Sequence, residues 1–251
     1  MSKKSKRNAP RGDGSAVSTS TPTSTPTPTP KRGPFNRTVL FATAVAVLLL
    51  AFVSGALFYN SERQREAQQV AARSKAQLAS EHSPSLGNAD AKVHIVEFLD
   101  PACETCAALY PHVKKLMADN PGRIRLSIRH VPLHQGSEHV VRMLEAARSQ
   151  GKYWQALEAV FASQDRWTVN HRVHAERAWP ALEGIGLDPD RIRGEMNSPE
   201  IAARMERDSA DARALNVTKT PEYFVNGRPM PRFGLEELQG LVREELRSAY
   251  R

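Results

Sequence analysis

The longest apolar stretch of the chain runs from Thr38 to Tyr59 and carries no charged side chain. A helix of this length rises about 33 Å, which is enough to cross a hydrocarbon core about 30 Å thick. We therefore expect residues 38–59 to form one transmembrane helix. A cleaved signal peptide is the alternative, because the small residues at 54–56 resemble a cleavage site. However, the apolar run continues beyond them, and the preceding charged region is long for a signal peptide.

Shorter apolar patterns begin after Ser83 and indicate a folded domain. The β-branched run Val93–Leu99 predicts a strand, and apolar residues at helical spacing follow from Cys103 to Asn120. Pro121-Gly122 ends this helix, and Ile124–Val131 alternates as a returning strand. Strand, helix and strand over this length predict a right-handed βαβ unit.

Residues 136–216 contain almost no strand pattern and indicate a helical insertion. Its predicted helices span Glu138–Gln150, Tyr153–Gln164, Ala175–Glu183 and Glu200–Leu215. Beyond the insertion, Glu222–Val225 resumes the strand pattern and Asn226-Gly227 predicts a hairpin turn. Leu235–Arg251 has the spacing of a final amphipathic helix.

The segments on either side of the apolar run differ in composition from a folded domain. Residues 18–30 contain only Ser, Thr and Pro, so we expect residues 1–37 to form a disordered basic tail in the cytoplasm. Residues 60–82 are rich in Ala, Gln, Glu and Arg, which favours a helix but offers little to bury. We expect them to form a solvated stalk that leads to a domain at residues 83–251.

The positive charge of the chain is concentrated in the tail. Eight Lys or Arg side chains and one Asp precede Thr38, which accounts for +7 of the formal net charge of +8. The positive-inside rule then places the tail in the cytoplasm and residues 60–251 outside it, where disulfides persist. The folded part is nearly neutral, so we expect no nucleic-acid partner.

The sequence holds two cysteines, Cys103 and Cys106, where the first predicted strand gives way to a helix. A helix N-terminus offers free N–H groups and the positive end of the helix dipole, and both stabilise a thiolate. Cys103 is therefore the expected nucleophile. Cys106, one turn further, can close a disulfide with it or resolve a mixed disulfide.

Other functions can be built on the same pair. A structural disulfide across four residues would stabilise the fold little. A metal-handling module, for zinc or for copper delivery, would need further ligands, and His130, His134 and His139 are the histidines that suggest one. We expect these histidines to lie instead in a loop and at a helix rim near the substrate groove. A redox-inactive chaperone or scaffold is the third alternative.

Features around the pair resemble the thioredoxin superfamily, and within it the DsbA-like branch of thiol:disulfide oxidoreductases. Glu97 lies six residues before Cys103, where these families place a buried acid. Pro111 matches the proline of their active-site helix, and Thr220-Pro221 precedes the late strand at the position of their cis-proline. Three further segments resemble the branch: Gly87–Lys92, Arg129–Leu133 and Gln150–Trp154.

This resemblance implies an α/β thioredoxin fold with a helical insertion, preceded by one N-terminal transmembrane helix. It implies an enzyme that exchanges disulfides with cysteine-containing proteins and needs no cofactor beyond the Cys103–Cys106 disulfide. An unidentified redox partner would recharge the pair, and the direction (oxidase, isomerase or reductase) stays open. The expected location is the bacterial cytoplasmic membrane, with the bilayer around residues 38–59 and the catalytic domain on the periplasmic side.

The implied site residues differ in their chemistry. Glu97 falls inside an apolar strand, so burial should raise its pKa and let it shuttle a proton for Cys106. If Pro221 is cis, Thr220 presents its backbone to a bound cysteine peptide beside Cys103.

Two positions depart from the DsbA-like branch, which usually carries Pro and often His between the cysteines. This chain has Glu104 and Thr105 there. A carboxylate at Glu104 opposes a thiolate at Cys103 and predicts a less oxidising disulfide. Thr220 before the proline also resembles isomerase-type and reductase-type members more than the main oxidase.

Overall fold

A computed structural model of the protein describes residues 37–78, 81–170 and 172–251. The expectation of a disordered tail falls almost wholly outside these described residues. By contacts the chain divides into two units, Met1–Ser54 and Gly55–Arg251. The five-stranded sheet, the helices that cover it and both cysteines belong to the second unit.

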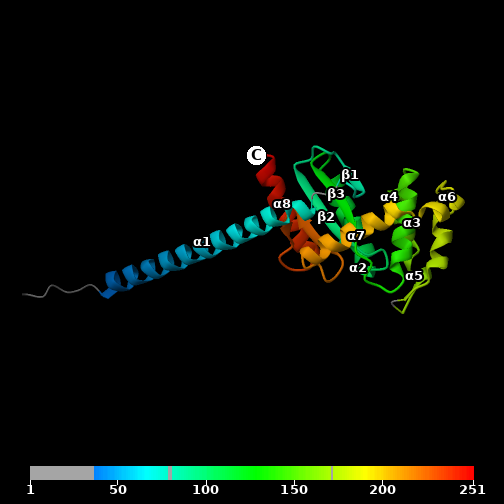
Figure 1. Ribbon diagram of the computed structural model, residues 1–251. Coiled ribbons are helices and arrows are strands. Elements are labelled where there is room, and N and C mark those ends of the chain that lie inside the picture. Colours follow the sequence, from blue (N-terminus) through cyan, green and yellow to red (C-terminus); the bar gives the residue numbers. More distant parts are fainter. Residues whose placement is uncertain (1–36, 79–80, 171) are drawn as a thin grey trace, which may run out of the picture. The chain divides into compact units, whose positions relative to one another are not determined.

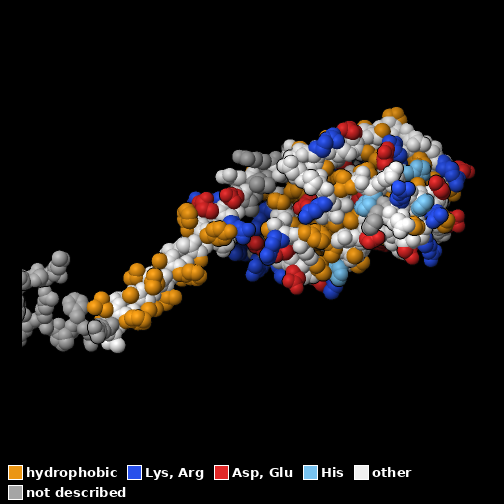
Figure 2. All heavy atoms as spheres, turned by 90° about the horizontal axis from the view of Figure 1, so that it is seen from below, with side chains coloured by type: hydrophobic (Ala, Val, Ile, Leu, Met, Phe, Trp, Pro, Cys, Tyr) orange, Lys and Arg blue, Asp and Glu red, His pale blue; other side chains and the backbone are white. Residues whose placement is uncertain are grey.

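The first described element is α1 (Arg37–Leu78), a helix of 42 residues. Its segment Thr38–Glu66 is long and apolar enough to cross a membrane. The most apolar part of this segment has a mean hydropathy of 2.5 and is not buried by protein. Figure 2 shows hydrophobic side chains along this part of the helix, whereas charged side chains are interspersed over the domain. One helix thus contains both the predicted membrane span and most of the predicted stalk.

The last turn of α1 departs from the expected solvated stalk. Ser74 and Leu78 are buried, and Leu78 packs in an apolar cluster with Val96 and Phe98. Leu78 is one of the few apolar residues in this stretch, and burying it stabilises the contact between helix end and domain. The stalk prediction was therefore wrong for the residues nearest the domain.

The domain is built on a five-stranded sheet in the order β1-β3-β2-β6-β7. Its strands are β1 (Ser85–Gly87), β2 (Val93–Leu99), β3 (Ile124–His130), β6 (Glu222–Val225) and β7 (Arg228–Pro229). β2 and β3 are parallel and the other neighbours are antiparallel. β2 lies between β3 and β6 and is buried on both faces, as expected of a nearly continuous apolar run.

Helices cover both faces of this sheet (Figure 1). Alternate residues of β2 (Val93, Ile95 and Leu99) share a core with α2 (Glu104–Ala118) and α8 (Leu235–Ala249). The other set, Val96 and Phe98, packs against Leu78 and α7 (Pro199–Ala214). Because side chains alternate along a strand, Glu97 belongs to the face that α2 covers.

The insertion between β3 and β6 is mostly helical, as the sequence predicts. It contains α3 (Ser137–Ser149), α4 (Tyr153–Ala162), α5 (Gln164–Trp167), α6 (Pro189–Glu195) and α7. Residues Ala175–Leu182 form a 3-10 helix that contains Pro180, a residue without an N–H to continue an α-helix. The sequence did not predict α6, nor the small antiparallel pair β4 (Thr168–Val169) and β5 (Arg172–Val173).

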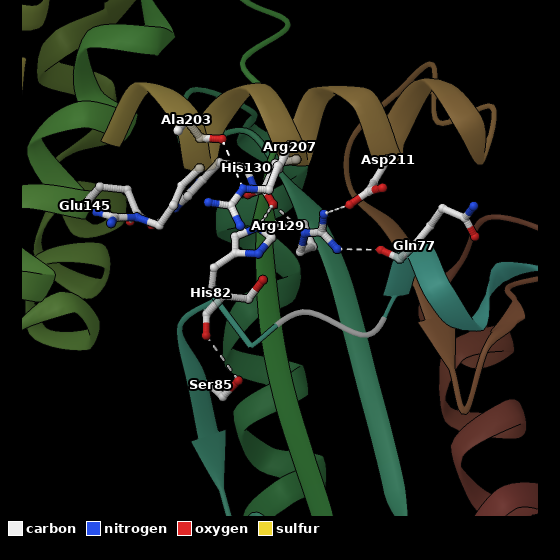
Figure 3. Close-up of polar contacts among 12 residues, drawn as sticks. Gln77, His82, Ser85, Arg129, His130, Glu145, Ala203, Arg207 and Asp211 are labelled. Atoms are coloured by element: carbon white, nitrogen blue, oxygen red, sulfur yellow. Dashed lines mark hydrogen bonds and ion pairs between the residues drawn. The ribbon is translucent and has the colours of Figure 1, made fainter. Parts of the chain in front are cut away.

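A buried arginine ties these parts together on the face away from α2. Arg129 of β3 is fully buried and donates hydrogen bonds to Asp208 and Asp211 of α7. It also donates to the carbonyl oxygen of Gln77 near the end of α1, at 2.6 Å (Figure 3). His82 contacts Asp208 at 2.9 Å. The end of α1, β3 and α7 are thus joined by hydrogen bonds and ion pairs around the buried Arg129.

Candidate active site

The two cysteines lie where β2 passes into α2. Cys103 is the residue that precedes the first turn of α2, with extended backbone angles (φ −76°, ψ 114°), and its N–H donates to the carbonyl oxygen of Asp100 at 3.0 Å. Both cysteines are free thiols, and Cys106 is completely buried whereas Cys103 keeps 7% of its surface exposed. A reagent or substrate therefore reaches Cys103 before Cys106.

The environment of Cys103 favours its thiolate. The hydrogen bond from the Cys106 thiol is the largest cause that lowers the pKa of Cys103, to about 5, and partial burial opposes it. The Thr220 side chain and the backbone N–H groups of Cys106 and Thr105 lower the pKa further. These N–H groups belong to the first turn of α2, where the helix dipole also favours an anion.

Cys106 has the opposite tendency. Burial raises its pKa well above the ordinary value, and its hydrogen bond to Cys103 and the nearby Glu97 charge raise it further. One thiol of the pair is therefore ready to ionise, and the other holds its proton.

Glu97 lies on β2, on the side covered by α2, and is completely buried. The Tyr223 hydroxyl donates to its Oε1 at 3.1 Å, and its Oε2 is buried without a hydrogen-bond partner among the described residues. Burial raises the pKa of Glu97 to about 8, although the Tyr223 hydrogen bond opposes the shift and the Cys103 charge adds to it. The expected desolvated carboxyl is therefore present beneath the cysteine pair.

Thr220 and Pro221 directly precede β6, and Thr220 contacts Cys103 although the two residues are far apart in the sequence. The peptide bond between Thr220 and Pro221 is cis, as the resemblance implied. The Cys103 thiol donates a hydrogen bond to the carbonyl oxygen of Thr220 at 3.3 Å. This carbonyl stabilises the protonated thiol, whereas the Thr220 side chain favours the thiolate, so the two groups of one residue act in opposite directions.

Glu104 and Thr105 are both exposed to solvent at the first turn of α2. Water screens a carboxylate in such a position, which weakens its repulsion of a neighbouring thiolate. The lowered pKa of Cys103 is opposite in direction to what Glu104 alone would impose. Glu104 is thus outweighed by the hydrogen bonds to Cys103.

The three histidines do not form one group. His130 is completely buried, against the expectation of a rim position, and contacts the Tyr153 hydroxyl at 2.9 Å. His134 lies on the loop after β3, and His139 is half-buried in α3. Within the described residues no cluster of three or more His, Cys, Asp or Glu side chains is placed to hold a metal ion.

One buried group near the cysteines was not singled out from the sequence. Asp100, three residues before Cys103, accepts hydrogen bonds from the backbone N–H of Ala102 and from two residues of the loop after β3, Leu133 and His134. Asp-Pro directly after an apolar strand is a turn signal that could have drawn attention to it. Its partners on the distant loop carry no such signal.

Comparison with known proteins places this site in a familiar fold. A family model described as "Thioredoxin" matches residues 79–244. A thioredoxin-like oxidoreductase from Silicibacter pomeroyi DSS-3 superposes with a TM-score of 0.60 at 27% identity, over 69% of this chain and 97% of that one. The thiol-disulfide exchange protein alpha-DsbA2 from Wolbachia pipientis gives 0.61 at 23% identity, over 73% and 97%. At that identity the likeness shows the fold alone.

Curated relatives include longer proteins that are named as antiporters. The chain is 34% identical over 142 residues to the Na(+)/H(+) antiporter NhaA of Herminiimonas arsenicoxydans, which is 57% of this chain and 22% of that protein. It is 32% identical over 146 residues to NhaA 3 of Salinispora tropica, with 57% and 21% covered. The match thus spans about a fifth of the length of these relatives.

Proposed function

Because this chain belongs to the thioredoxin family, we propose that it is a thiol–disulfide oxidoreductase acting on cysteine-containing proteins through Cys103 and Cys106. The observation that carries the proposal is the asymmetry of the pair. Cys103 keeps 7% of its surface exposed at the start of α2, and its pKa is lowered to about 5, whereas Cys106 is completely buried with a raised pKa. Thiol–disulfide exchange needs one cysteine that attacks or leaves as a thiolate, and a second that stays protonated until it resolves the mixed disulfide.

The reaction runs in two exchanges when the protein starts as the disulfide. A substrate thiolate attacks Sγ of Cys103, the Cys103–Cys106 bond breaks, and Cys106 leaves as a thiolate that takes up a proton. A second substrate thiolate then attacks the substrate sulfur of the mixed disulfide and releases Cys103 as a thiolate. Two electrons pass from the substrate to the pair, and the substrate gains one disulfide.

Glu97 is the proposed proton donor and acceptor for Cys106. A pKa of about 8 leaves this carboxyl mostly protonated at neutral pH, so it can give a proton to the Cys106 thiolate as that thiolate leaves. In the reverse direction the carboxylate takes the proton when Cys106 attacks a mixed disulfide. The buried Oε2 without a hydrogen-bond partner among the described residues is suited to carry that proton.

We propose that the pair oxidises its substrates. A stabilised Cys103 thiolate stabilises the dithiol form and makes the disulfide more oxidising. The partner that recharges the pair must then accept two electrons from the dithiol. This direction differs from the one that Glu104 suggested, because hydrogen bonds to Cys103 outweigh the exposed carboxylate.

The proposed location is a membrane surface outside the cytoplasm. The apolar segment of α1 supports a bilayer anchor at residues 38–59, and the basic residues before it support a cytoplasmic N-terminus. A reporter that is active only in the cytoplasm, fused after Arg251, should be silent. Ion transport belongs to the longer antiporters, and our proposal concerns the domain that this chain shares with them.

Catalysis by purified full-length protein in detergent tests the function. The wild type should oxidise a reduced, unfolded protein with two cysteines and should turn over when a small disulfide recharges it. Cys103→Ala should lose all turnover, and Cys106→Ala should accumulate a mixed disulfide through Cys103. A wild type that neither oxidises nor reduces protein cysteines would favour a scaffold role. Tightly bound copper or zinc in the reduced protein would favour metal handling.

A further inference from the structure

Beyond Cys103, Cys106, Glu97 and Thr220, the site contains one more buried carboxylate, which reacts with nothing in the proposed exchange. Asp100 is completely buried between β2 and the cysteine pair. A buried carboxylate is costly unless hydrogen bonds satisfy it. Its partners are therefore informative about what it does.

One oxygen of Asp100 shapes the turn that carries the nucleophile. Oδ1 accepts from the N–H of Ala102 at 2.9 Å, and the main-chain oxygen of Asp100 accepts from the N–H of Cys103 at 3.0 Å. Together these bonds form a tight turn in which the side chain imitates a backbone carbonyl. The turn ends at Cys103, directly before the first turn of α2.

The other oxygen holds a distant loop. Oδ2 accepts from the N–H of Leu133 at 2.7 Å and of His134 at 2.8 Å, and it lies 2.8 Å from Nδ1 of the His134 ring. This loop follows β3 and carries Leu133, whose side chain is 50% exposed, an unusual degree for a large apolar residue of the described domain. The same carboxylate thus joins the turn of Cys103 to an exposed apolar side chain.

The turn is also held from the insertion. The side-chain amide of Gln164 donates to the carbonyl oxygen of Pro101 at 2.8 Å, and Gln164 is itself buried. Pro101 and Ala102 therefore have polar contacts on two sides. The hydrogen bond of Gln164 reaches only Pro101, whereas the hydrogen bonds of Asp100 reach both Cys103 and the loop of Leu133 and His134.

We propose that Asp100 is a positioning residue, whose carboxylate fixes the Cys103 sulfur at the start of α2 and against Thr220 by clamping its turn to the loop of Leu133 and His134. The catalytic part of this inference rests on the proposed function, whereas the part that concerns the position of the Cys103 sulfur does not. Asp100 itself exchanges no proton or electron with the substrate.

Asp100→Asn is the direct test because the amide has nearly the same shape. It retains one acceptor oxygen for Ala102 but turns an NH2 group toward the N–H donors of Leu133 and His134. The turn should loosen, and Cys103 should lose part of its contact with the N–H groups of α2. Asp119→Asn is the matched control, because it removes the same charge from an exposed side chain at the end of α2 that pairs with Lys115.

The readouts are the pKa of Cys103, from thiolate absorbance in the full-length reduced protein, and its alkylation rate at pH 6. Asp100→Asn should raise that pKa by about one unit or more and slow alkylation by about twofold or more. Asp119→Asn should change neither. If Asp100→Asn changes the stability of the protein but leaves the pKa and the alkylation rate of Cys103 at wild-type values, Asp100 has only a structural role and the inference is overturned.

A second variant keeps the test decisive if Asp100→Asn does not fold. His134→Ala removes one donor to Oδ2 from a side chain that is 27% exposed and leaves the two backbone donors in place. It should slow alkylation of Cys103 in the same direction but less, and an unchanged rate would overturn the clamp. Turnover of the wild type is measured separately. A wild type without turnover refutes the proposed function, whereas wild-type turnover with an unmoved Cys103 in both variants refutes only this inference.

Discussion

The carbonyl oxygen of Thr220 lies 3.3 Å from Sγ of Cys103, although 117 positions separate the two residues along the chain. One contact therefore joins the end of β2 to the loop before β6, and it does so at the sulfur that is most exposed to a substrate. The side chain of the same Thr lowers the pKa of Cys103, so Thr220 is poised to affect both its position and its ionisation.

Thr220→Val should raise the pKa of Cys103, because the variant keeps the backbone and the shape of the side chain but removes the hydroxyl. A rise of about one to two units corresponds to the loss of one hydrogen bond to a charged group. Thiolate absorbance across pH measures it. Thr105→Val, at an exposed position, is the control and should leave the pKa in place. Equal titrations of Thr220→Val and wild type would contradict the assigned role of the hydroxyl.

Glu97→Gln should slow the exchange and remove a step from its pH profile. The wild-type profile should change near pH 8, the pKa of the buried carboxyl, and the variant should lack that change. Stopped-flow reaction with a test disulfide between pH 6 and 10 measures both. A variant with wild-type rates at every pH would exclude Glu97 from proton transfer to Cys106.

The same substitution should increase stability at alkaline pH. The pKa of Glu97 rises from 4.5 to about 8 on folding, so the folded state binds more protons and stability falls as pH rises between those values. The loss approaches roughly 5 kcal/mol above pH 8. Glu97→Gln lacks this loss, so its free energy of unfolding should rise relative to that of the wild type as pH increases. Denaturant unfolding at pH 5 and pH 8.5 tests this, and an identical difference at both values would contradict it.

Asp208→Asn should destabilise the domain by about 3–5 kcal/mol, because it leaves the buried guanidinium of Arg129 without one of its charged partners. Arg213→Met is the control, since Arg213 pairs with Glu206 on the surface with both side chains mostly exposed. Loss of such a surface pair costs less than about 1 kcal/mol. Urea unfolding of the full-length variants in detergent compares them. Equal losses would mean that the network in Figure 3 adds no more than a surface pair.

Glu104→His should lower the pKa of Cys103 and raise the reduction potential, because it removes a carboxylate beside the thiolate and adds a possible cation. The exposure of Glu104 limits the shift to less than about one pKa unit, or about 30 mV for each 1.4 kcal/mol. Thiolate titration and equilibration with glutathione measure the two quantities. If neither moves, the carboxylate is fully screened by water and has no part in setting the potential.

The sequence predicted the elements whose patterns are local. Val93–Leu99 and Glu222–Val225 have the predicted bounds, and Asn226-Gly227 forms the predicted turn between β6 and β7. The strands β4 and β5 are too short to show an alternation of apolar and polar residues, since each has two residues. The burial of Leu78 depends on partners more than ten residues away, so no local pattern could predict it.

The candidate site divides in the same way. The Cys-x-x-Cys spacing and the acid inside an apolar strand are local features, and the structure brings Cys103, Cys106 and Glu97 together. The sequence alone could not identify Asp100 as a site residue, because the groups that donate hydrogen bonds to it lie on a loop more than thirty residues later. The effect of Glu104 stays a prediction, and the sequence alone could not weigh it against the hydrogen bonds that favour the Cys103 thiolate, which include one from Thr220.

The redox equilibrium of the Cys103–Cys106 pair against glutathione tests the central proposal most directly. The full-length protein is equilibrated at a series of ratios of reduced to oxidised glutathione, and the dithiol is quantified by alkylation and mass measurement. We expect a single two-electron transition with a potential above about −200 mV, in the range of oxidising pairs. A potential below about −300 mV, the range of structural disulfides, or the lack of any reversible transition would contradict it.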